Sequence, residues 1–289
     1  MLKGSIVALI TPFKDDGLDE DNYIKLIHYH LKNGTNGIVP GGTTGESPTL
    51  SHNEHKKIIE ISVKECKSKI PVVAGTGSNS TQEAIELSKF AEKAGSDALL
   101  VVTPYYNKPT QEGLYQHYKK INDNVGIPIV IYNIPSRSVI DMSVETMTKL
   151  YELKNIIGVK DATGDLKRVE LQKRSMGNEF IQLTGNDDNA LEFNKLGGAG
   201  AIGVTANIAA KLSSEFQKAC VEDKDKAVEL NKILQPLHEA MFIESNPSPV
   251  KYAASLLKMC NSSVRLPLVE VENTTKVKIS EALKVAKIL

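Results

Sequence analysis

The stretch "IIGVKDATGDL", residues 156–166, joins an apolar β-rich run to a single lysine. Residues 156–159 are those of a buried strand, and Lys160 follows at the point where the strand would end. The Thr-Gly-Asp sequence that comes next is typical of a turn. The stretch therefore predicts a buried strand with an ammonium group at its carboxyl end.

Seven further runs of the same kind occur along the chain, each closed by Gly, Pro, Asn or Thr. They are SIVALITP from residue 5, GIVPGG from 37, PVVAGTG from 71, ALLVVTP from 98, PIVIYNIP from 128, IQLTGND from 181 and AIGVTAN from 201. Runs that are apolar throughout are typical of parallel strands covered on both faces. Eight strand-helix units predict an α/β fold, a (β/α)8 TIM barrel.

The segments between these runs carry helix signals. Ser51 with Glu54, and Ser80 with Glu83, fit capping boxes, and Gly95 fits a helix stop. Strand signals end near residue 210, and three helical segments follow. We therefore predict a barrel over residues 1–224, which carries the active site, and a C-terminal helical extension over 225–289, a surface for packing or for oligomer contacts.

An open doubly wound sheet is the alternative to a barrel. Such a sheet more often has a glycine-rich phosphate turn after its first strand, whereas this chain has "ITPFKDDG" there. The stretch "AGTGSNS" after the third run breaks the G-x-G-x-x-G pattern at its last position. A dinucleotide site is therefore not expected.

Composition points to a small-molecule ligand. The 289 residues carry 35 Lys+Arg and 35 Asp+Glu with no block of like charge, so neither a nucleic acid nor a membrane is an expected partner. The first apolar run has only six residues before Thr11 and Pro12, too few for a signal segment. Three widely spaced cysteines fit a reducing compartment. We expect a cytoplasmic protein.

In a barrel, the active site lies where the strands end, which places Lys160 at its rim. The lysine could simply extend its ammonium group to solvent. Alternatively, a desolvated amine could attack a keto group in its neutral form and give a Schiff base. Tyr132 would lie on the adjacent strand, about 4.8 Å away, where a phenol could shuttle protons. A tyrosine in a strand can also be a core residue.

Two loops carry further candidate residues. The stretch "GGTTGES", residues 41–47, could form an anion-holding nest in which Thr43 and Thr44 add hydroxyl donors for a small carboxylate, although it could also be an ordinary turn. Arg137 follows Pro135 in "YNIPSRS", where it could bind a carboxylate through two hydrogen bonds or remain solvated.

These motifs together resemble those of the dihydrodipicolinate synthase and N-acetylneuraminate lyase family of class I pyruvate aldolases. "GTTGE", "TPYYNKP", "YNIPSR", "GVKDATG" and "GAIGVTAN" occur in this order along nearly the whole chain. Within the family the likeness is greatest to the synthases, because Arg137 and Thr43 match them, whereas the lyases generally lack that arginine and have serine in the place of Thr43. The resemblance implies condensation of pyruvate with L-aspartate 4-semialdehyde to 4-hydroxy-tetrahydrodipicolinate, in lysine and diaminopimelate biosynthesis.

The resemblance also implies a role for each matching residue. Lys160 would form the Schiff base, and Tyr132 would relay protons through Thr44 to Tyr106, a residue expected to cross from a neighbouring subunit. Thr43 and Thr44 would hold the pyruvate carboxylate, Arg137 that of the second substrate, and Gly185 and Ile202 would line the pocket. Asp161, where glutamate is frequent, and Asn186, in "TGND" rather than "SGDD", depart from the pattern.

The family resemblance also leads to expectations about regulation, assembly and cofactors. The positions that match the lysine-binding site of feedback-sensitive synthases are Ser47, His52, His55, Asn79, Glu83 and Tyr105. A crossing tyrosine requires at least a dimer, and the resemblance favours a homotetramer, a dimer of dimers. No metal or organic cofactor is expected. The rival functions are another pyruvate aldolase, acting on sialic acid or a 2-keto-3-deoxy sugar acid, and a non-catalytic barrel that binds a keto acid.

Overall fold

Eight parallel strands form the centre of the computed structural model, which describes residues 2–67 and 69–289. In chain order the strands are β1 (Gly4–Ala8), β4 (Gly37–Val39), β5 (Val73–Gly75), β6 (Ala98–Val102), β7 (Ile129–Asn133), β8 (Ile156–Asp161), β9 (Ile181–Thr184) and β10 (Gly200–Gly203). The spatial order is β4-β1-β10-β9-β8-β7-β6-β5, and a parallel bridge between Ile38 and Val72 joins the two ends. The barrel prediction is confirmed.

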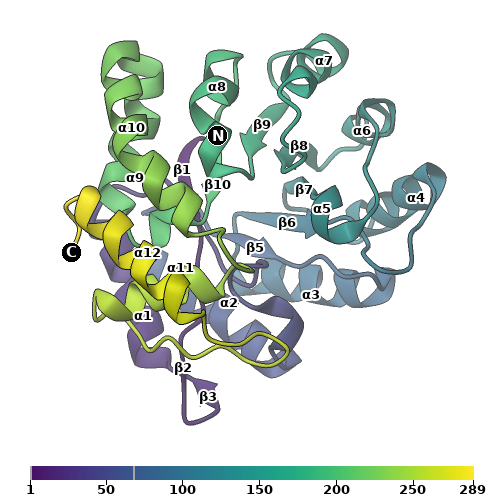
Figure 1. Cartoon of the computed structure of the whole chain (residues 1–289). Coiled ribbons are helices and arrows are strands. Elements are labelled where there is room, and N and C mark those ends of the chain that lie inside the picture. The colour runs from purple at the N-terminus through teal and green to yellow at the C-terminus, as the bar shows by residue number, and fades with distance from the viewer. Residues whose placement is uncertain (1, 68) are drawn as a thin grey trace.

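Helices surround the strands, as Figure 1 shows. They are α1 (Glu20–Lys32), α2 (His52–Cys66), α3 (Thr81–Ala94), α4 (Gln111–Asn122), α5 (Pro135–Ser138), α6 (Val144–Tyr151), α7 (Lys167–Met176), α8 (Ala190–Lys195) and α9 (Ala210–Glu222). A hairpin of β2 (Phe13–Lys14) and β3 (Gly17–Leu18), which the sequence analysis does not anticipate, follows the first barrel strand.

The helix signals in the sequence correspond to real caps, with one difference. The reciprocal capping box at Ser51 and Glu54 is present, and Gly95 ends α3 in the left-handed conformation with φ of 97°. At Ser80, only half of the predicted box forms, because its hydroxyl accepts from the backbone of Glu83 while the Glu83 carboxylate bonds to His52 and Ser78. The Glu83 side chain is therefore turned away from the helix cap.

The C-terminal helices α10 (Lys224–Ala240), α11 (Ser248–Leu256) and α12 (Asn273–Val285) lie together against the barrel, green to yellow in Figure 1. One apolar cluster joins them to the barrel shell: Leu234, Leu237, Val250 and Ile279 pack with residues of α1, α2 and α9. The extension thus shares a core with the barrel, and the boundary at residues 224 and 225 stays a prediction.

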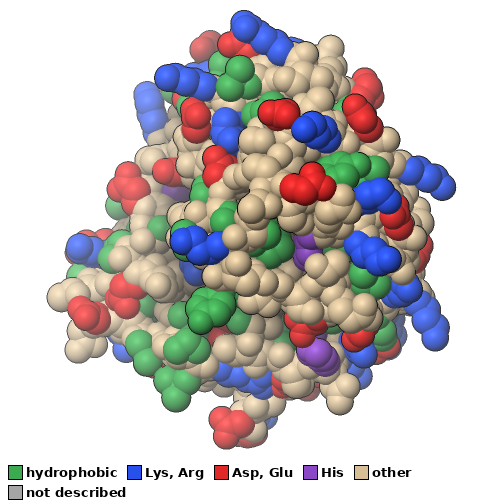
Figure 2. All heavy atoms as spheres, turned by 90° about the vertical axis from the view of Figure 1, so that its right-hand side faces the viewer, with side chains coloured by type: hydrophobic (Ala, Val, Ile, Leu, Met, Phe, Trp, Pro, Cys, Tyr) green, Lys and Arg blue, Asp and Glu red, His purple; other side chains and the backbone are tan. Residues whose placement is uncertain are grey.

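The barrel interior has its own apolar cluster, which includes Tyr132, Leu183 and Ile202. Because side chains alternate along a strand, Lys160 points into this interior while Asp161 points outward toward the helices. On the face shown in Figure 2, acidic and basic side chains are interspersed. None of the helices in the described residues combines the length and apolar character needed to span a bilayer.

Candidate active site

Lys160 and Tyr132 lie side by side at the ends of two adjacent strands. Strands β7 and β8 pair in a register that sets Tyr132 directly opposite Lys160. The Lys160 Nζ lies 4.1 Å from the centroid of the Tyr132 ring, so the contact is with the face of the ring. Lys160 is only 5% exposed, which excludes the solvated rim lysine that the sequence pattern allowed. The amine is instead held inside the barrel mouth.

Gly185, just beyond β9, gives the lysine its room. A Cβ at this position would lie 2.9 Å from Cε of Lys160 and 2.7 Å from Cβ of Ala162. Both distances are too short for carbon atoms that are not bonded to each other. A larger residue would therefore displace the lysine side chain.

The loop over residues 41–47 is shaped by its glycines. Gly41 has φ of 65°, and a Cβ there would lie 2.4 Å from Nε2 of His55. The loop uses several of its own backbone donors, because Gly45 N donates to Gly42 O and Glu46 N donates to Thr43 O, at 3.0 and 3.1 Å. The loop is thus a tight turn, and the groups that it presents to the barrel mouth are the side chains of Thr43 and Thr44.

A residue of the extension, Asn246, connects the two predicted carboxylate-binding elements. Its Nδ2 donates to Oγ1 of Thr44 at 3.0 Å, and its backbone carbonyl accepts from Nη2 of Arg137 at 3.1 Å. Because the Thr44 oxygen accepts here, its own hydrogen is left for another acceptor. Asn246 lies 202 residues from Thr44, and no pattern within the sequence links the two positions.

These groups surround one cavity of about 600 Å³. The predicted residues that line it are Thr43, Thr44, Tyr132, Arg137, Lys160, Gly185 and Asn186. A second part of its wall comes from the extension: His238, Glu239, Phe242, Ser245 and Asn246. Sequence reasoning assigned the extension to packing or oligomer contacts and missed this wall, because the segment carries helix periodicity and no motif of its own.

Lys160 and Arg137 are the cationic groups of the lining, and Asp188 and Glu239 stand among the other lining residues. A small dicarboxylate or a keto acid with a second charged group fits this combination of a buried amine, an arginine and two threonine hydroxyls. The arrangement can hold a carboxylate at the loop, attack a carbonyl with the amine, and move protons through the phenol of Tyr132.

Two of the predicted catalytic and substrate-binding residues do not line this cavity. Ile202 on β10 is fully buried in the barrel core together with Tyr132 and does not line the cavity. Tyr106 is 88% exposed, with φ of 73°, and it too lies outside the cavity lining of its own chain. A bulky aromatic residue held in the left-handed region on the surface is uncommon.

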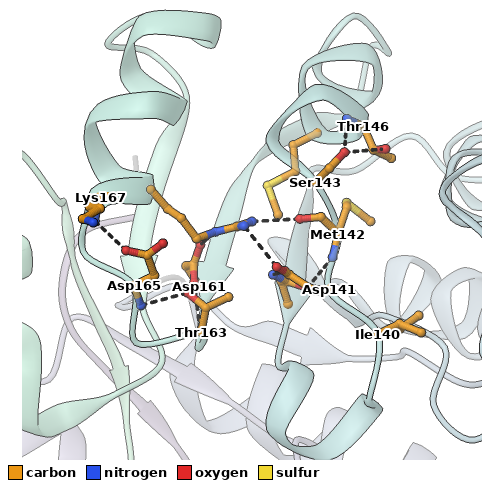
Figure 3. A network of polar contacts seen from close by, with 12 residues as sticks. Ile140, Asp141, Met142, Ser143, Thr146, Asp161, Thr163, Asp165 and Lys167 are labelled. Atoms are coloured by element: carbon orange, nitrogen blue, oxygen red, sulfur yellow. Dashed lines mark hydrogen bonds and ion pairs between the residues drawn. The ribbon is translucent and has the colours of Figure 1, made fainter.

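A buried polar network stands behind Lys160. The Asp161 carboxylate accepts from Nε of Arg168 at 3.0 Å, from Gln172 at 2.9 Å, and from the backbone and hydroxyl of Thr163. Arg168 also bonds to the carboxylate of Asp141 and to the carbonyl of Met142. Figure 3 shows these segments held together by the network. It fixes the end of β8, where Lys160 is attached, against the segment that follows Arg137.

Several residues of the predicted effector set lie around Glu83. The Ser78 hydroxyl donates to one Glu83 oxygen, and His52 Nε2 lies 2.8 Å from the other, so the pKa of Glu83 is lowered, chiefly by Ser78 and further by His52. Burial and the nearby Glu83 raise the pKa of Tyr105. His55, by contrast, is buried with its Nε2 donating to the carbonyl of Gly75 at 2.7 Å, and burial lowers its pKa.

The sequence matches one known family along almost its full length, the Dihydrodipicolinate synthetase family, over residues 1–286. The curated 4-hydroxy-tetrahydrodipicolinate synthase of Pelagibacter ubique is 68% identical over 293 aligned residues, which cover 100% of both chains.

Solved structures with the same fold carry related descriptions. The chloride inhibited dihydrodipicolinate synthase from Acinetobacter baumannii complexed with pyruvate has a TM-score of 0.98 and 45% identity, with 100% of each chain covered. The DHDPS from Cyanidioschyzon merolae with lysine bound has a TM-score of 0.96 and 34% identity, with 99% of each chain covered.

Proposed function

The chain belongs to the dihydrodipicolinate synthetase family, and on this basis we propose that Lys160 is the nucleophile of its reaction. The enzyme condenses pyruvate with L-aspartate 4-semialdehyde to give 4-hydroxy-tetrahydrodipicolinate, in lysine and diaminopimelate biosynthesis. The observation that supports the proposed residue is the buried Lys160 amine beside Tyr132 in a cavity with two threonine hydroxyls and an arginine. A lysine so placed supplies covalent chemistry directly.

The first half of the reaction forms the imine. The Lys160 amine attacks the keto carbon of pyruvate, and the resulting carbinolamine loses water to become a Schiff base. Loss of water needs a proton donor, for which the Tyr132 phenol is placed beside the amine. The hydroxyls of Thr43 and Thr44 hold the carboxylate of pyruvate, and the amide of Asn246 leaves the Thr44 hydrogen free to be donated.

The second half forms the carbon–carbon bond. The imine acts as an electron sink, so the pyruvyl methyl group loses a proton and becomes an enamine carbon, which attacks the aldehyde. The amine of the second substrate then displaces Lys160 as the ring closes. Arg137, anchored by the Asn246 carbonyl at the cavity edge, is suited to the carboxylate of the semialdehyde because a guanidinium can bind it through two parallel bonds.

A residue from a second copy of the chain completes the proton relay. Tyr106 is exposed in its own subunit, where it is far too open to relay protons from Tyr132. In a dimer, Tyr106 of one copy would enter the site of the other and accept protons through Thr44. We therefore infer a dimer as the smallest active unit and a tetramer as a dimer of dimers. A cytoplasmic location remains our inference, and the free cysteines Cys66, Cys220 and Cys260 agree with it.

The first test is steady-state turnover of pyruvate with L-aspartate 4-semialdehyde, coupled to NADPH oxidation by an excess of the next reductase. We expect saturable turnover in the wild type and a loss of at least about a thousandfold in Lys160→Ala, with the fold unchanged by circular dichroism. Near-wild-type turnover of Lys160→Ala would overturn the assignment of the nucleophile.

Borohydride trapping with pyruvate separates the rival functions. If no turnover is found, a trapped pyruvate on Lys160 would indicate another aldolase, and tests with sialic acid and 2-keto-3-deoxy sugar acids would follow. Absence of both turnover and adduct would favour a keto-acid-binding barrel. A Lys160→Ala variant that still traps pyruvate would place the imine on another lysine.

We further propose that L-lysine inhibits the enzyme by binding near Glu83. The partly exposed carboxylate of Glu83, with His52 and Tyr105 beside it, supplies an acceptor for an ammonium group. Ser47 and Asn79 complete the proposed set, whereas the His55 imidazole is already bonded to Gly75 and would act only by holding the loop. Activity measured against millimolar L-lysine should fall in the wild type and fall less in Glu83→Gln. A flat wild-type curve would reject this proposal.

A further inference from the structure

A fully buried ion pair lies beneath the loop that presents Thr43 and Thr44. Nζ of Lys251, on α11, donates to Oε1 of Glu46 at 2.7 Å, and both side chains are 0% exposed. Among the ion pairs in the described part of the chain, it is the only one with no exposure on either side. Burial lowers the pKa of Lys251, and the Glu46 carboxylate opposes that change.

The remaining polar atoms around the pair are also bonded. Lys251 donates a second hydrogen bond to the carbonyl of Thr11 at 2.8 Å, and the backbone N–H of Arg265 donates to Oε2 of Glu46 at 3.0 Å. The Phe13 ring contacts both cations, with its centroid 4.1 Å from Lys251 Nζ and 4.2 Å from the Arg265 guanidinium carbon. The pair is therefore part of a complete network between the barrel and the extension.

The network reaches the substrate-binding loop through its backbone. Glu46 has left-handed dihedrals, φ of 57° and ψ of 36°, and its N–H donates to the carbonyl of Thr43. Thr11 connects the loop to Lys251. Its hydroxyl donates to the carbonyl of Gly45 at 2.7 Å, and its own backbone carbonyl accepts from Nζ of Lys251. Fixing the Glu46 side chain thus fixes the turn that aims Thr43 and Thr44 into the cavity. Glutamate is not favoured in this backbone conformation, so side-chain contacts must hold it there.

The extension therefore holds this loop at two points. Asn246 bonds to Thr44 at the cavity wall, and Lys251, near the start of α11, bonds to Glu46 below the turn. A buried ion pair contributes little net stability, because the desolvation of both charges offsets their attraction. What such a pair does provide is a fixed position for the loop.

We propose that the Glu46–Lys251 pair is a positioning device for pyruvate, through which the C-terminal extension sets the Thr43 and Thr44 hydroxyls for the substrate carboxylate. Neither residue touches the substrate. The inference rests on the proposed function, in which these hydroxyls bind pyruvate. It predicts that damage to the pair weakens pyruvate binding far more than it slows the chemical step or the use of the second substrate.

Glu46→Gln is the direct test, because it removes the charge at nearly unchanged volume. We expect the KM for pyruvate to rise about tenfold, while kcat and the KM for L-aspartate 4-semialdehyde change less than about threefold. Thr11→Val is the milder variant, with the fold retained and a rise in pyruvate KM of about threefold, since it removes only the hydrogen bond to Gly45.

The double variant Glu46→Gln/Lys251→Met separates positioning from stability. Removing both charges leaves no unpaired buried ion, so its thermal midpoint should exceed that of Lys251→Met, yet its pyruvate KM should stay raised. Leu114→Ala, on the buried face of α4 and away from the extension, is the control for lost stability alone: its midpoint falls while its pyruvate KM stays at the wild-type value.

Two outcomes would overturn the proposal. One is a wild-type pyruvate KM in Thr11→Val and in the double variant, which would make the pair purely structural. The other is a pyruvate KM that rises equally in Leu114→Ala. Borohydride trapping of pyruvate by the wild-type enzyme distinguishes these outcomes from failure of the proposed function, because it does not involve the variants: no adduct would remove the function itself, whereas a normal adduct with unshifted variants removes only the positioning role.

Discussion

The cavity has two sides that are built in different ways. On the nucleophile side, Lys160 and Tyr132 stand on neighbouring strands, and the supporting contact between Asp161 and Arg168 spans seven residues of sequence. On the carboxylate side, the loop with Thr44 is held by Lys251, which is 205 residues from its partner Glu46. The first side is assembled from consecutive strand-helix units, and the second depends on how the end of the chain packs against its beginning.

The difference lies in what fixes each geometry. Parallel strands that follow one another pair in the sheet, and their register sets which side chains meet. An extension helix has no such register, and its position follows from the shape of the apolar surface that it covers. We therefore expect defects on the nucleophile side to lower kcat and defects on the carboxylate side to raise the KM for pyruvate.

The largest change in free energy is expected for the stability of Arg168→Met, which tests the nucleophile side. It leaves the buried Asp161 carboxylate without its cation, which should lower the free energy of unfolding by about 3–5 kcal/mol. It should also lower kcat about tenfold with little change in pyruvate KM, since β8 loses its support. Urea unfolding and steady-state kinetics check both parts. Arg174→Met removes an exposed ion pair on the same helix and should change neither.

Gly185→Ala is expected to have the next largest effect. The added methyl group would meet Cε of Lys160 at 2.9 Å and push the amine aside, so kcat should fall about a hundredfold. The matched control is Gly17→Ala in the β2–β3 hairpin, where a Cβ would meet only the Lys14 carbonyl at 3.7 Å. A kcat within threefold of wild type in Gly185→Ala would show that the Lys160 side chain can move away from the added methyl group without loss of activity.

The pH dependence of stability tests two buried histidines of the barrel helices, one on α1 and one on α4. Burial lowers the pKa of His30 on α1 to about 3, and that of His117 on α4 to about 4, from the usual 6.5. Below pH 6.5 the unfolded chain binds protons that the folded chain does not. Stability should therefore fall as the pH is lowered from 6.5 toward 5, by up to about 1.4 kcal/mol per pH unit for each histidine.

Urea unfolding at pH 7, 6 and 5 measures this slope, in a range where ordinary carboxylates remain ionised. Replacing His117 by Asn should remove part of the slope, and replacing His30 by Asn a further part. The rest should come from His55 and His238, because burial lowers their pKa values too. A slope that is unchanged in both variants would show that other groups control acid unfolding.

The smallest effect is expected at Val139, next to the segment that carries Arg137. This β-branched residue is 65% exposed and has φ of 68°, a region that it rarely adopts. Val139→Gly should raise the free energy of unfolding by about 1 kcal/mol, because the relief of strain exceeds the added chain entropy. Val277→Gly, on the exposed face of α12, should lower it by about the same amount. Destabilisation in both variants would mean that Val139 is not strained.

Much of the nucleophile side follows from the sequence. The eight apolar runs predict the barrel, and the positions of Tyr132 and Lys160 at consecutive strand ends predict their contact, because both follow from strand register. The glycines of the loop over residues 41–47 are likewise recognisable from their spacing. The two predicted capping boxes show the limit of such patterns: Ser51 and Glu54 form one, whereas the Glu83 carboxylate turns to His52, a partner from another helix.

The rest required the folded chain. The family resemblance names Tyr106 as part of the relay and implies that it crosses from a neighbouring subunit; the structure adds that it is exposed and lies outside the cavity lining of its own chain. Asn246 and the other extension residues of the cavity wall belong to no sequence motif that could have indicated their position in the cavity. Glu46 stands in the "GTTGE" stretch, and nothing in that stretch indicates a partner near the end of the chain.

The family resemblance supplied the class of chemistry, and the sequence pattern by itself determined the order of strands and helices and the adjacent positions of Lys160 and Tyr132. These depend on alternation, periodicity and nearest-neighbour pairing, which are local properties of a chain. Only the tertiary structure decided that the extension forms a wall of the active site and that a buried ion pair supports its loop. Those contacts join residues about 200 positions apart, and they exist only after apolar packing has brought the two ends of the chain together.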